Sequence, residues 1–487
     1  MMKLNNILYG VSLEAVSGPT DIDIKAIDFD SRNIQNGWLF VAVPGTQVDG
    51  HDFITKAIEM GASAIICEVM PEELEDSVTY VQVKESGKAL GIMASNYFEN
   101  PSRELKLIGV TGTNGKTTVA TLLYKLFSHL GYKSGLLSTI TNIIGEEEIS
   151  ATHTTPDALQ LNRLLKSMVD AGCTHCFMEV SSHALDQGRV AGLEFTGGIF
   201  TNISHDHLDY HKTFDEYIKA KKLLFDNLPS SAFSLVNTDD KRGRIMLQNT
   251  KSQKSTYSLK SASEFKAKIV SNSLEGLELT IDGRDVWFKI FGDFNAYNLL
   301  SIYGAACLLG EDPEEVLMAL SQLDAAPGRL EQVPSEQDVT ALVDYAHTPD
   351  ALKNVLATIN NFRSGNEKLI TVVGCGGDRD KDKRPVMAAI ACELSDKVIL
   401  TSDNPRTEPP MNIIKEMMTG VGPSEMRKTL SIEDREEAIK TACMLAEGKD
   451  IILVAGKGHE PYQEINGTRH PFDDREVLGR MLRLMKN

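Results

Sequence analysis

The chain has 487 residues, 42% hydrophobic and 24% charged, which is the composition of a soluble globular protein with two or three domains. A formal net charge of −18 weighs against general nucleic-acid binding, but it allows a locally positive pocket for an anionic small molecule. No apolar run is long enough to span a membrane and residues 1–6 do not resemble a secretory signal, so we expect a cytoplasmic protein without membrane partners.

Residues 1–100 are expected to form an N-terminal domain. Residues 38–43 predict a strand, residues 53–60 a helix that ends at the C-cap glycine Gly61, and residues 64–67 a second strand. The polar segment 99–103 closes the domain, because residues before a proline tend to leave a helix.

Residues 101–325 predict a central domain that carries a nucleotide-binding loop. A strand at 105–110 precedes the loop, and a helix follows it, with apolar residues at helical spacing until Gly131. The loop itself consists of Gly112, Thr113, Asn114, Gly115, Lys116, Thr117 and Thr118. Its glycines let backbone N–H groups face a triphosphate, Lys116 adds a charge near the β- and γ-phosphates, and Thr117 can coordinate Mg²⁺. Val110 stands where the first Walker glycine is expected, but the strand–loop–helix context favours a nucleotide loop over an ordinary turn.

A second polar cluster follows in the central domain. Glu179 ends a predicted strand, and residues 202–211 contain three histidines. Three histidines in so short a segment are unusual for Mg²⁺, which prefers oxygen ligands, so a zinc hydrolase is an alternative on this segment alone. The neighbouring phosphate loop favours Mg-ATP. Cys173 and Cys176 form a C-x-x-C, but they lead into an apolar strand, which favours core thiols over redox or metal chemistry.

Residues 326–487 predict a second α/β domain. Strands are expected near 341–343, 369–373, 398–401 and 451–455, each followed by a polar or glycine-rich loop. In open α/β sheets, binding sites gather at the carboxyl ends of the strands. The loops 374–380, 403–406 and 456–460 would therefore bring Arg379, Arg406 and Glu460 together. Two guanidinium groups and a carboxylate suit a zwitterion that bears carboxylates and an amine.

The segment after the first of these strands contains a helix start. Thr348 is expected to cap a helix that begins at Pro349, with Asp350 in its first turn. This structural explanation covers those three residues. It leaves Asp344 and His347 at the strand end without a structural reason, which makes them candidate functional residues.

The phosphate loop resembles that of the Mur ligase superfamily, and further motifs in the same order, from residues 30–32 to 456–460, are similar to those of its diaminopimelate-adding members. The resemblance covers nearly the whole chain. It implies an α/β fold of three domains: a UDP-substrate-binding domain (1–100), a central P-loop ATPase-type parallel sheet (101–325) and a C-terminal Rossmann-like amino-acid-binding domain (326–487). It implies an ATP-dependent amide ligase of peptidoglycan synthesis, which we expect to be a monomer. Such a ligase would add meso-2,6-diaminopimelate to UDP-N-acetylmuramoyl-L-alanyl-D-glutamate through an acyl phosphate, releasing ADP and phosphate.

The same resemblance assigns roles residue by residue. It places the nucleotide substrate on Phe29, Ser31, Thr46, Gln47, Val48, His153, Thr154, Thr155, Ser181, Gln187 and Arg189, with His153 standing where Asn is common in relatives. It places ATP on the phosphate loop with Asn295, Asn298, Arg329 and Asp344, and diaminopimelate on Arg379, Asp403, Asn404, Pro405, Arg406, Gly456 and Glu460. Mg²⁺ would be held by Thr117, Glu179, His207 and Lys221, the last as N6-carboxylysine formed with CO₂, although the adjacent Lys222 leaves that register open. The catalytic residues implied are Lys116, His207, Lys221, Asp344 and His347.

Arg406 is expected to determine which amino acid the ligase adds. Lysine lacks the second carboxylate of diaminopimelate, and a buried guanidinium without a partner is costly, so the pocket should reject lysine. Arg406 and the uridine motifs disfavour two alternatives in the same superfamily, the lysine-adding and the folyl-polyglutamate-type ligases. A nucleotide-binding regulatory protein without turnover is a third alternative, which Lys116, Glu179, His207 and Asp344 disfavour.

Overall fold

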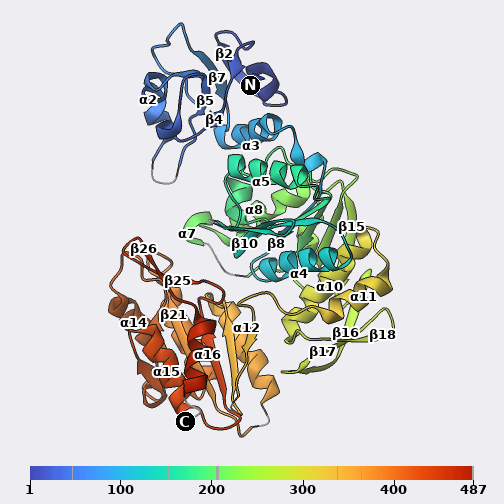
Figure 1. Ribbon diagram of the computed structural model, residues 1–487, viewed down its shortest axis with the longest axis vertical. Coiled ribbons are helices and arrows are strands. Elements are labelled where there is room, and N and C mark those ends of the chain that lie inside the picture. Colours follow the sequence, from blue (N-terminus) through green and yellow to red (C-terminus); the bar gives the residue numbers. More distant parts are fainter. Residues whose placement is uncertain (46–47, 152, 205–207, 337, 364, 485–487) are drawn as a thin grey trace. The chain divides into compact units, whose positions relative to one another are not determined.

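The computed structural model describes residues 1–45, 48–151, 153–204, 208–336, 338–363 and 365–484. The chain divides into two compact units. Figure 1 labels the helices and strands along the chain. Unit 1 consists of Met1–Gly112, Leu123–Thr201 and Asp215–Thr256, and unit 2 consists of Thr113–Leu122, Asn202–Phe214 and Tyr257–Asn487.

Unit 1 begins with a five-stranded sheet in the order β2-β7-β6-β5-β4. Its strands are β2 (Leu13–Ser17), β4 (Ile27–Asp28), β5 (Trp38–Val41), β6 (Ala62–Cys67) and β7 (Thr79–Val83), all parallel except β2, beside a small pair of β1 (Met2–Lys3) and β3 (Asp23–Ile24). Helices α1 (Leu4–Ile7) and α3 (Ser86–Tyr97) pack on one face and α2 (Ile54–Glu59) on the other. Gly61 follows α2 with a φ of +99°, which confirms the predicted glycine cap.

Eight strands of an eleven-stranded sheet belong wholly or partly to unit 1, in the order β11-β10-β9-β12-β8-β13-β14-β15. Its strands are β8 (Lys106–Thr111), β9 (Ser134–Leu137), β10 (Thr141–Ile144), β11 (Glu147–Ser150), β12 (His175–Glu179), β13 (Gly197–Phe200), β14 (Phe233–Asn237) and β15 (Gln253–Ser258). Strands β9, β12, β8, β13 and β14 are parallel, while β10 and β11 form an antiparallel edge hairpin. The helices are α5 (Ala158–Asp170), α6 (Ser182–Asp186), α8 (Phe214–Asp226) and α9 (Gly243–Met246), and α4 (Lys116–His129) follows β8 in the chain.

Unit 2 contains three antiparallel strands of the eleven-stranded sheet and a separate six-stranded sheet. The antiparallel strands are β16 (Phe265–Ser273), β17 (Gly276–Ile281) and β18 (Arg284–Phe288), accompanied by α10 (Asp293–Leu308) and α11 (Pro313–Gln322); the short helix α7 (Leu208–His211) also belongs to this unit. The six-stranded sheet runs β19-β20-β24-β21-β22-β23 and is parallel except at β19. Its strands are β19 (Glu331–Val333), β20 (Thr340–Asp344), β21 (Leu369–Cys375), β22 (Lys397–Ser402), β23 (Thr429–Ser431) and β24 (Ile451–Ala455).

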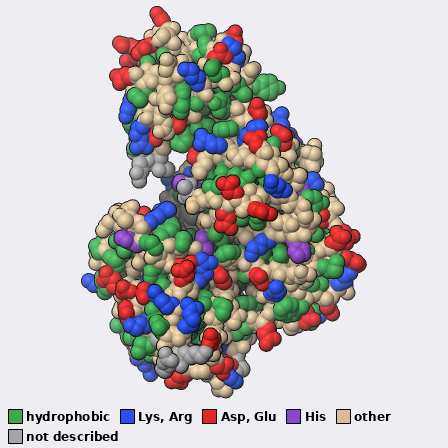
Figure 2. All heavy atoms as spheres, viewed as in Figure 1, with side chains coloured by type: hydrophobic (Ala, Val, Ile, Leu, Met, Phe, Trp, Pro, Cys, Tyr) green, Lys and Arg blue, Asp and Glu red, His purple; other side chains and the backbone are tan. Residues whose placement is uncertain are grey.

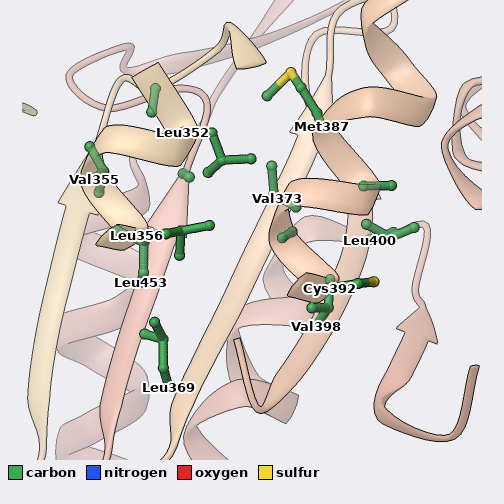
Figure 3. Packing of buried hydrophobic residues seen from close by; sticks show 14 of the residues in the cluster. Leu352, Val355, Leu356, Leu369, Val373, Met387, Cys392, Val398, Leu400 and Leu453 are labelled. Carbon is green, nitrogen blue, oxygen red and sulfur yellow. The ribbon is translucent and has the colours of Figure 1, made fainter. Parts of the chain in front are cut away.

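Helices cover both faces of this six-stranded sheet. On one face lie α12 (Pro349–Phe362), α13 (Lys383–Leu394) and α14 (Pro410–Met418), and on the other α15 (Arg435–Leu445) and α16 (Asp474–Leu484). Successive strand residues point to opposite faces of the sheet. Leu453 packs with Leu356 of α12, as Figure 3 shows, whereas Ile452 and Val454 belong to the core beneath α15 and α16. A hairpin of β25 (Tyr462–Ile465) and β26 (Thr468–Pro471) lies between β24 and α16 in the chain.

The predicted fold class is confirmed, because parallel strands and covering helices dominate the largest sheets. Cys173 and Cys176 are buried as expected for core thiols, and burial raises the pKa of both. On the face in view, Figure 2 shows acidic and basic side chains interspersed, without a continuous basic surface among the described residues. None of the described helices is both long and apolar enough to cross a membrane.

Candidate active site

The phosphate loop lies between β8 and α4. Gly115 has a φ of +88°, a conformation that a side chain would strain, and α4 begins at the next residue, Lys116. Helix N-termini present free N–H groups and a positive dipole end, which suits a phosphate. Lys116 Nζ donates to the Thr113 carbonyl oxygen at 3.0 Å. The side chains of Thr113, Thr117 and Thr118 are buried.

Asn202, which the sequence did not single out, ties this loop to the segment after β13. Its carbonyl oxygen accepts from Thr113 N at 2.8 Å, and its side chain both accepts from Asn114 N at 3.0 Å and donates to Asn114 O at 3.1 Å. Ser204 N donates to the Thr113 hydroxyl at 3.0 Å. These bonds attach Thr113 and Asn114 of the phosphate loop to the segment that follows β13.

Arg329 reaches the phosphate loop within unit 2. Its Nη2 donates to the Thr117 hydroxyl at 2.9 Å, and its guanidinium stacks 4.6 Å from the centre of the Tyr345 ring. Arg329 Nε is buried, and no described residue hydrogen-bonds to it. The structure therefore brings together Thr117 and Arg329, two residues that the sequence assigned to the ATP site.

Asp344, at the end of β20, has a structural explanation that the sequence did not reveal. Its Oδ2 accepts from Leu330 N at 2.6 Å and its Oδ1 from Ala346 N at 2.7 Å, so it fixes two loops. Burial raises the pKa of the Asp344 carboxyl to about 6, against the opposing charge of Arg329. His347 Nδ1 lies 2.9 Å from the Tyr345 carbonyl oxygen. The expectation that Asp344 lacks a structural reason is thus wrong.

The helix after β20 begins as predicted. The Thr348 side chain accepts from Ala351 N at 3.3 Å, and Pro349 occupies the first helical position of α12.

Two asparagines lie on α10 as a pair. Asn295 Nδ2 donates to the Phe291 carbonyl oxygen at 2.8 Å, and Asn298 Nδ2 donates to Asn295 Oδ1 at 2.9 Å. Both side chains are buried.

In unit 1, the end of β12 gathers several residues assigned to the nucleotide substrate. Glu179 Oε1 accepts from Thr139 N at 2.7 Å, and the Glu179 carbonyl oxygen accepts from the Thr155 hydroxyl at 2.8 Å. The Thr154 hydroxyl lies 3.0 Å from the hydroxyl of Thr139. Glu179 is 1% exposed, so its environment is protein rather than water.

Arg189 completes this cluster. Its Nη1 donates to the Thr155 carbonyl oxygen at 2.9 Å, while Nε and Nη2 donate to Gln187 Oε1 at 2.9 and 2.5 Å. Ser181 caps α6 and its backbone N–H donates to the Thr155 hydroxyl at 3.1 Å. Thr154, Thr155, Glu179, Ser181, Gln187 and Arg189 therefore form one hydrogen-bonded group.

Lys221 and Lys222 on α8 differ in their partners. Lys221 is 1% exposed and its Nζ donates to the Gly112 carbonyl oxygen at 2.8 Å, with the Tyr217 ring 4.6 Å away. Lys222 pairs with Asp226 of the same helix. Of these two lysines, Lys221 is therefore the one that contacts the phosphate loop.

The remaining residues of the nucleotide-substrate assignment are dispersed. In the N-terminal sheet region, Phe29 is 39% exposed, Ser31 is buried and Val48 is 56% exposed. His153 is exposed. Thr46, Gln47 and His207 lie outside the described residues.

Three loops meet at the carboxyl edge of the six-stranded sheet, as predicted. Gly377 N donates to the Asn404 carbonyl oxygen at 2.9 Å, which joins the loops after β21 and β22. Arg406 Nη1 donates to the Gly377 carbonyl oxygen at 2.8 Å, and Arg406 lies at a φ of +51°. Arg379 is more peripheral, with Nη1 3.3 Å from the carbonyl oxygen of its neighbour Asp378.

The loop after β24 joins this edge through Glu460. Asn404 Nδ2 donates to Glu460 Oε2 at 2.7 Å, and the Tyr345 hydroxyl lies 3.4 Å from Glu460 Oε1. A side chain on Gly456 would meet Asp403 Oδ2 at 2.6 Å, so only glycine fits there. Burial would raise the pKa of the Asp403 carboxyl, but Lys457 and the other cations around it hold that pKa below its ordinary value.

Buried cations beneath this edge were missed in the sequence. Arg384, Arg435 and Lys457 are each at most 1% exposed. Arg384 donates to both carboxylate oxygens of Glu408, from Nη2 to Oε1 at 2.8 Å and from Nη1 to Oε2 at 3.0 Å. These bonds lower the pKa of the Glu408 carboxyl to about 2. Charged residues are almost never fully buried unless they are paired. Because their partners are far away in the sequence, no local pattern predicts which of them are buried.

Comparison with known proteins gives three family matches along the chain. Residues 23–98 match the Mur ligase family, catalytic domain; residues 110–306 match the Mur ligase middle domain; and residues 328–458 match the Mur ligase, glutamate ligase domain. A protein of Cytophaga hutchinsonii named UDP-N-acetylmuramoyl-L-alanyl-D-glutamate--2,6-diaminopimelate ligase is 60% identical over 99% of each chain. A protein of the same name from Phocaeicola vulgatus is 55% identical over 98% of this chain and 99% of its own. A solved structure of a ligase with that name aligns over 100% of this chain and 99% of its own, with 33% identity and a TM-score of 0.70.

Proposed function

This chain belongs to the Mur ligase family, and we propose that it adds meso-2,6-diaminopimelate to UDP-N-acetylmuramoyl-L-alanyl-D-glutamate in an ATP-dependent reaction of peptidoglycan synthesis. The observation that carries the proposal is that the loops bearing Arg406 and Glu460 both bond to the Asn404 loop or its neighbour Gly377 at one sheet edge, where Arg406 also pairs with Glu464 at 3.7 Å. An amino acid with a carboxylate and an ammonium group needs opposite charges of this kind.

The reaction forms an amide bond in two steps. The side-chain carboxylate of the substrate's D-glutamate attacks the γ-phosphorus of ATP, giving an acyl phosphate and ADP. The free amine of diaminopimelate then attacks the acyl carbon, and phosphate leaves. Lys116 leaves its contact with Thr113 O to neutralise charge on the transferring phosphoryl group, and Arg329 adds a second cation through its position at Thr117.

Mg²⁺ is the metal that ATP chemistry of this family implies. Within the described residues, no ready-made group of three His, Cys, Asp or Glu side chains could hold a metal. The assigned donors Thr117 and Glu179 supply the hard oxygens that Mg²⁺ prefers, but Lys221 fits only if its amine becomes a carbamate. We propose that Lys221 is carbamylated by CO₂, because its buried Nζ points at Gly112 O of the phosphate loop whereas Lys222 pairs with Asp226. When bound, Mg²⁺ would neutralise phosphate charge.

The sugar-nucleotide substrate is assigned to the hydrogen-bonded group around Thr155 and Arg189, with Phe29, Ser31 and Val48 for the uridine part. The Arg189 guanidinium and the N-terminus of α6 suit anionic groups. We further propose that the domains divide near residues 100 and 325, and that the protein acts as a cytoplasmic monomer.

Product analysis tests the proposed function. The purified protein is incubated with ATP, Mg²⁺, the UDP-muramyl dipeptide and diaminopimelate, and the nucleotide products are separated and weighed by mass spectrometry. The expected result is one UDP-muramyl tripeptide for each ADP and phosphate formed. ATP hydrolysis without a tripeptide, or ADP formation that does not depend on the dipeptide, would contradict the proposal.

A further inference from the structure

Lys457 is a fully buried cation in the loop after β24, with 0% exposure. Its Nζ lies 3.1 Å from Asn404 Oδ1 and 3.1 Å from Glu460 Oε2. Asn404 Nδ2 in turn donates to the same Glu460 oxygen at 2.7 Å. The three side chains therefore close a triangle in which each contacts the other two.

We propose that Lys457 is a positioning residue that acts through Glu460, aiming that carboxylate at the ammonium group of the incoming amino acid and holding it ionised. The proposal rests on the proposed function, since it takes Glu460 to receive that ammonium group. Lys457 itself is not expected to touch the substrate, because no part of it is exposed.

The triangle leaves one oxygen of Glu460 available. Oε2 already accepts from both Asn404 and Lys457, whereas the contact of Oε1 with the Tyr345 hydroxyl is long, at 3.4 Å. A carboxylate held through one oxygen presents the other in a fixed direction. An ammonium group has three donors and no acceptor, and it pairs well with such an oxygen.

The charges around the triangle alternate in sign. Asp474 holds Arg435 through two bonds of 2.8 and 2.7 Å, and Arg435 and Lys457 together lower the pKa of the Asp403 carboxyl against its burial. Arg406 also lowers the pKa of Asp403, so with Glu460 ionised the three carboxylates lie among three cations.

Glu460 needs this cation to stay charged. Burial raises the pKa of the Glu460 carboxyl, Asp403 raises it further, and Lys457 opposes both. The titratable and charged groups that interact with Glu460 are Tyr345, Asp403, Arg435, Lys457 and Tyr462. Of the two cations among them, only Lys457 contacts Glu460 directly. Removing it leaves a buried carboxylate that takes up a proton at higher pH.

The test uses the full-length enzyme with Lys457→Met, which keeps an unbranched side chain that is one atom shorter and removes its charge. Steady-state phosphate release gives kcat and KM for diaminopimelate and for ATP between pH 6 and 9.5. The expected result is a KM for diaminopimelate raised about tenfold or more with the KM for ATP within about twofold, the size expected for one lost charged contact. The acid limb of log kcat/KM for diaminopimelate should move to higher pH.

Lys415→Met on the exposed side of α14 is the matched control and should leave all these values unchanged. If Lys457→Met does not fold, Lys457→Gln, which can still donate to Asn404, carries the same test. A lower kcat together with higher KM values for both diaminopimelate and ATP, without movement of the acid limb, would show a merely structural role and overturn the proposal. A wild-type enzyme without diaminopimelate-dependent phosphate release would instead overturn the proposed function.

Discussion

Lys221 Nζ lies 2.8 Å from the carbonyl oxygen of Gly112, the first glycine of the phosphate loop. Lys221 is 1% exposed, so its amine lies inside the protein beside the phosphate loop. Carbamylation would turn this amine into an oxygen ligand. The contact therefore favours Lys221 over Lys222 as the modified residue.

Replacement of Lys221 by alanine should abolish most activity. We expect kcat for phosphate release to fall by about 100-fold, the loss typical of removing a group that orients a metal, and a small carboxylate such as formate to restore part of it. Lys222→Ala removes only the pair with Asp226 and is the matched control. Equal losses in the two variants, or full wild-type activity in CO₂-free buffer, would contradict the carbamate.

Arg329 should matter for ATP. Arg329→Met removes the bond to the Thr117 hydroxyl and the stacking on Tyr345, so kcat/KM for ATP should fall by about 10- to 100-fold, as expected for a charged hydrogen bond worth about 1.5–3 kcal/mol. Arg244→Met, at an exposed site on α9, should behave as wild type. An unchanged KM for ATP would place Arg329 outside the nucleotide site.

Arg406 should set the choice of amino acid. In Arg406→Met the second carboxylate of diaminopimelate loses its partner, so kcat/KM for diaminopimelate should fall by about 1000-fold or more. The kcat/KM for lysine should not change, because lysine has no second carboxylate. The measurement is phosphate release with each acceptor, and the exposed Arg427→Met is the control. A variant that still prefers diaminopimelate as strongly as wild type would refute the role of Arg406.

The sequence predicted those parts of the site that depend on short-range patterns. The phosphate loop, the Thr348 cap of α12 and the four parallel strands that end in loops all follow from neighbouring residues. Contacts between distant residues were not predictable in this way. Asp344 binds the backbone at Leu330, and Asn202 binds the phosphate loop 88 positions earlier.

The buried cations show the same limit. Nothing in the local sequence separates Lys457, which is fully buried, from Lys415, which is exposed, because burial depends on how the loops after β22 and β24 meet. The antiparallel hairpin of β10 and β11 was also not expected, since it adds partly exposed strands to the edge of a parallel sheet.

His175 should make the protein sensitive to acid. It is 1% exposed between Phe127, Tyr132 and Phe177, and burial lowers its pKa to about 4. The unfolded chain binds a proton near pH 6.5 and the folded chain does not, so stability is lost as pH falls from about 6.5 towards 4. At pH 5 the loss amounts to roughly 2 kcal/mol.

His175→Phe should remove this dependence. Urea unfolding at pH 7.5 and pH 5 should show a smaller decrease in the free energy of unfolding for the variant than for the wild type. The exposed His153→Phe controls for the loss of a histidine as such. An identical pH dependence in wild type and His175→Phe would show that His175 is not the responsible group.

Leu453 tests the core of the six-stranded sheet. It lies on β24 with 0% exposure and faces the helices around Leu356 (Figure 3). Leu453→Ala should lower the free energy of unfolding by about 2–5 kcal/mol, because it removes buried apolar surface and leaves a cavity. Met444→Ala, at a side chain that is 68% exposed, should change it little. A thermal or urea unfolding curve measures both.

The most direct test of the central claim is ATP-dependent phosphate release with the UDP-muramyl dipeptide, comparing meso-diaminopimelate with L-lysine as acceptor. We predict rapid release with diaminopimelate and little with lysine, because only diaminopimelate offers a carboxylate to Arg406. Release with lysine alone would contradict the account of the pocket, and no release with either acceptor would contradict the proposed ligase activity.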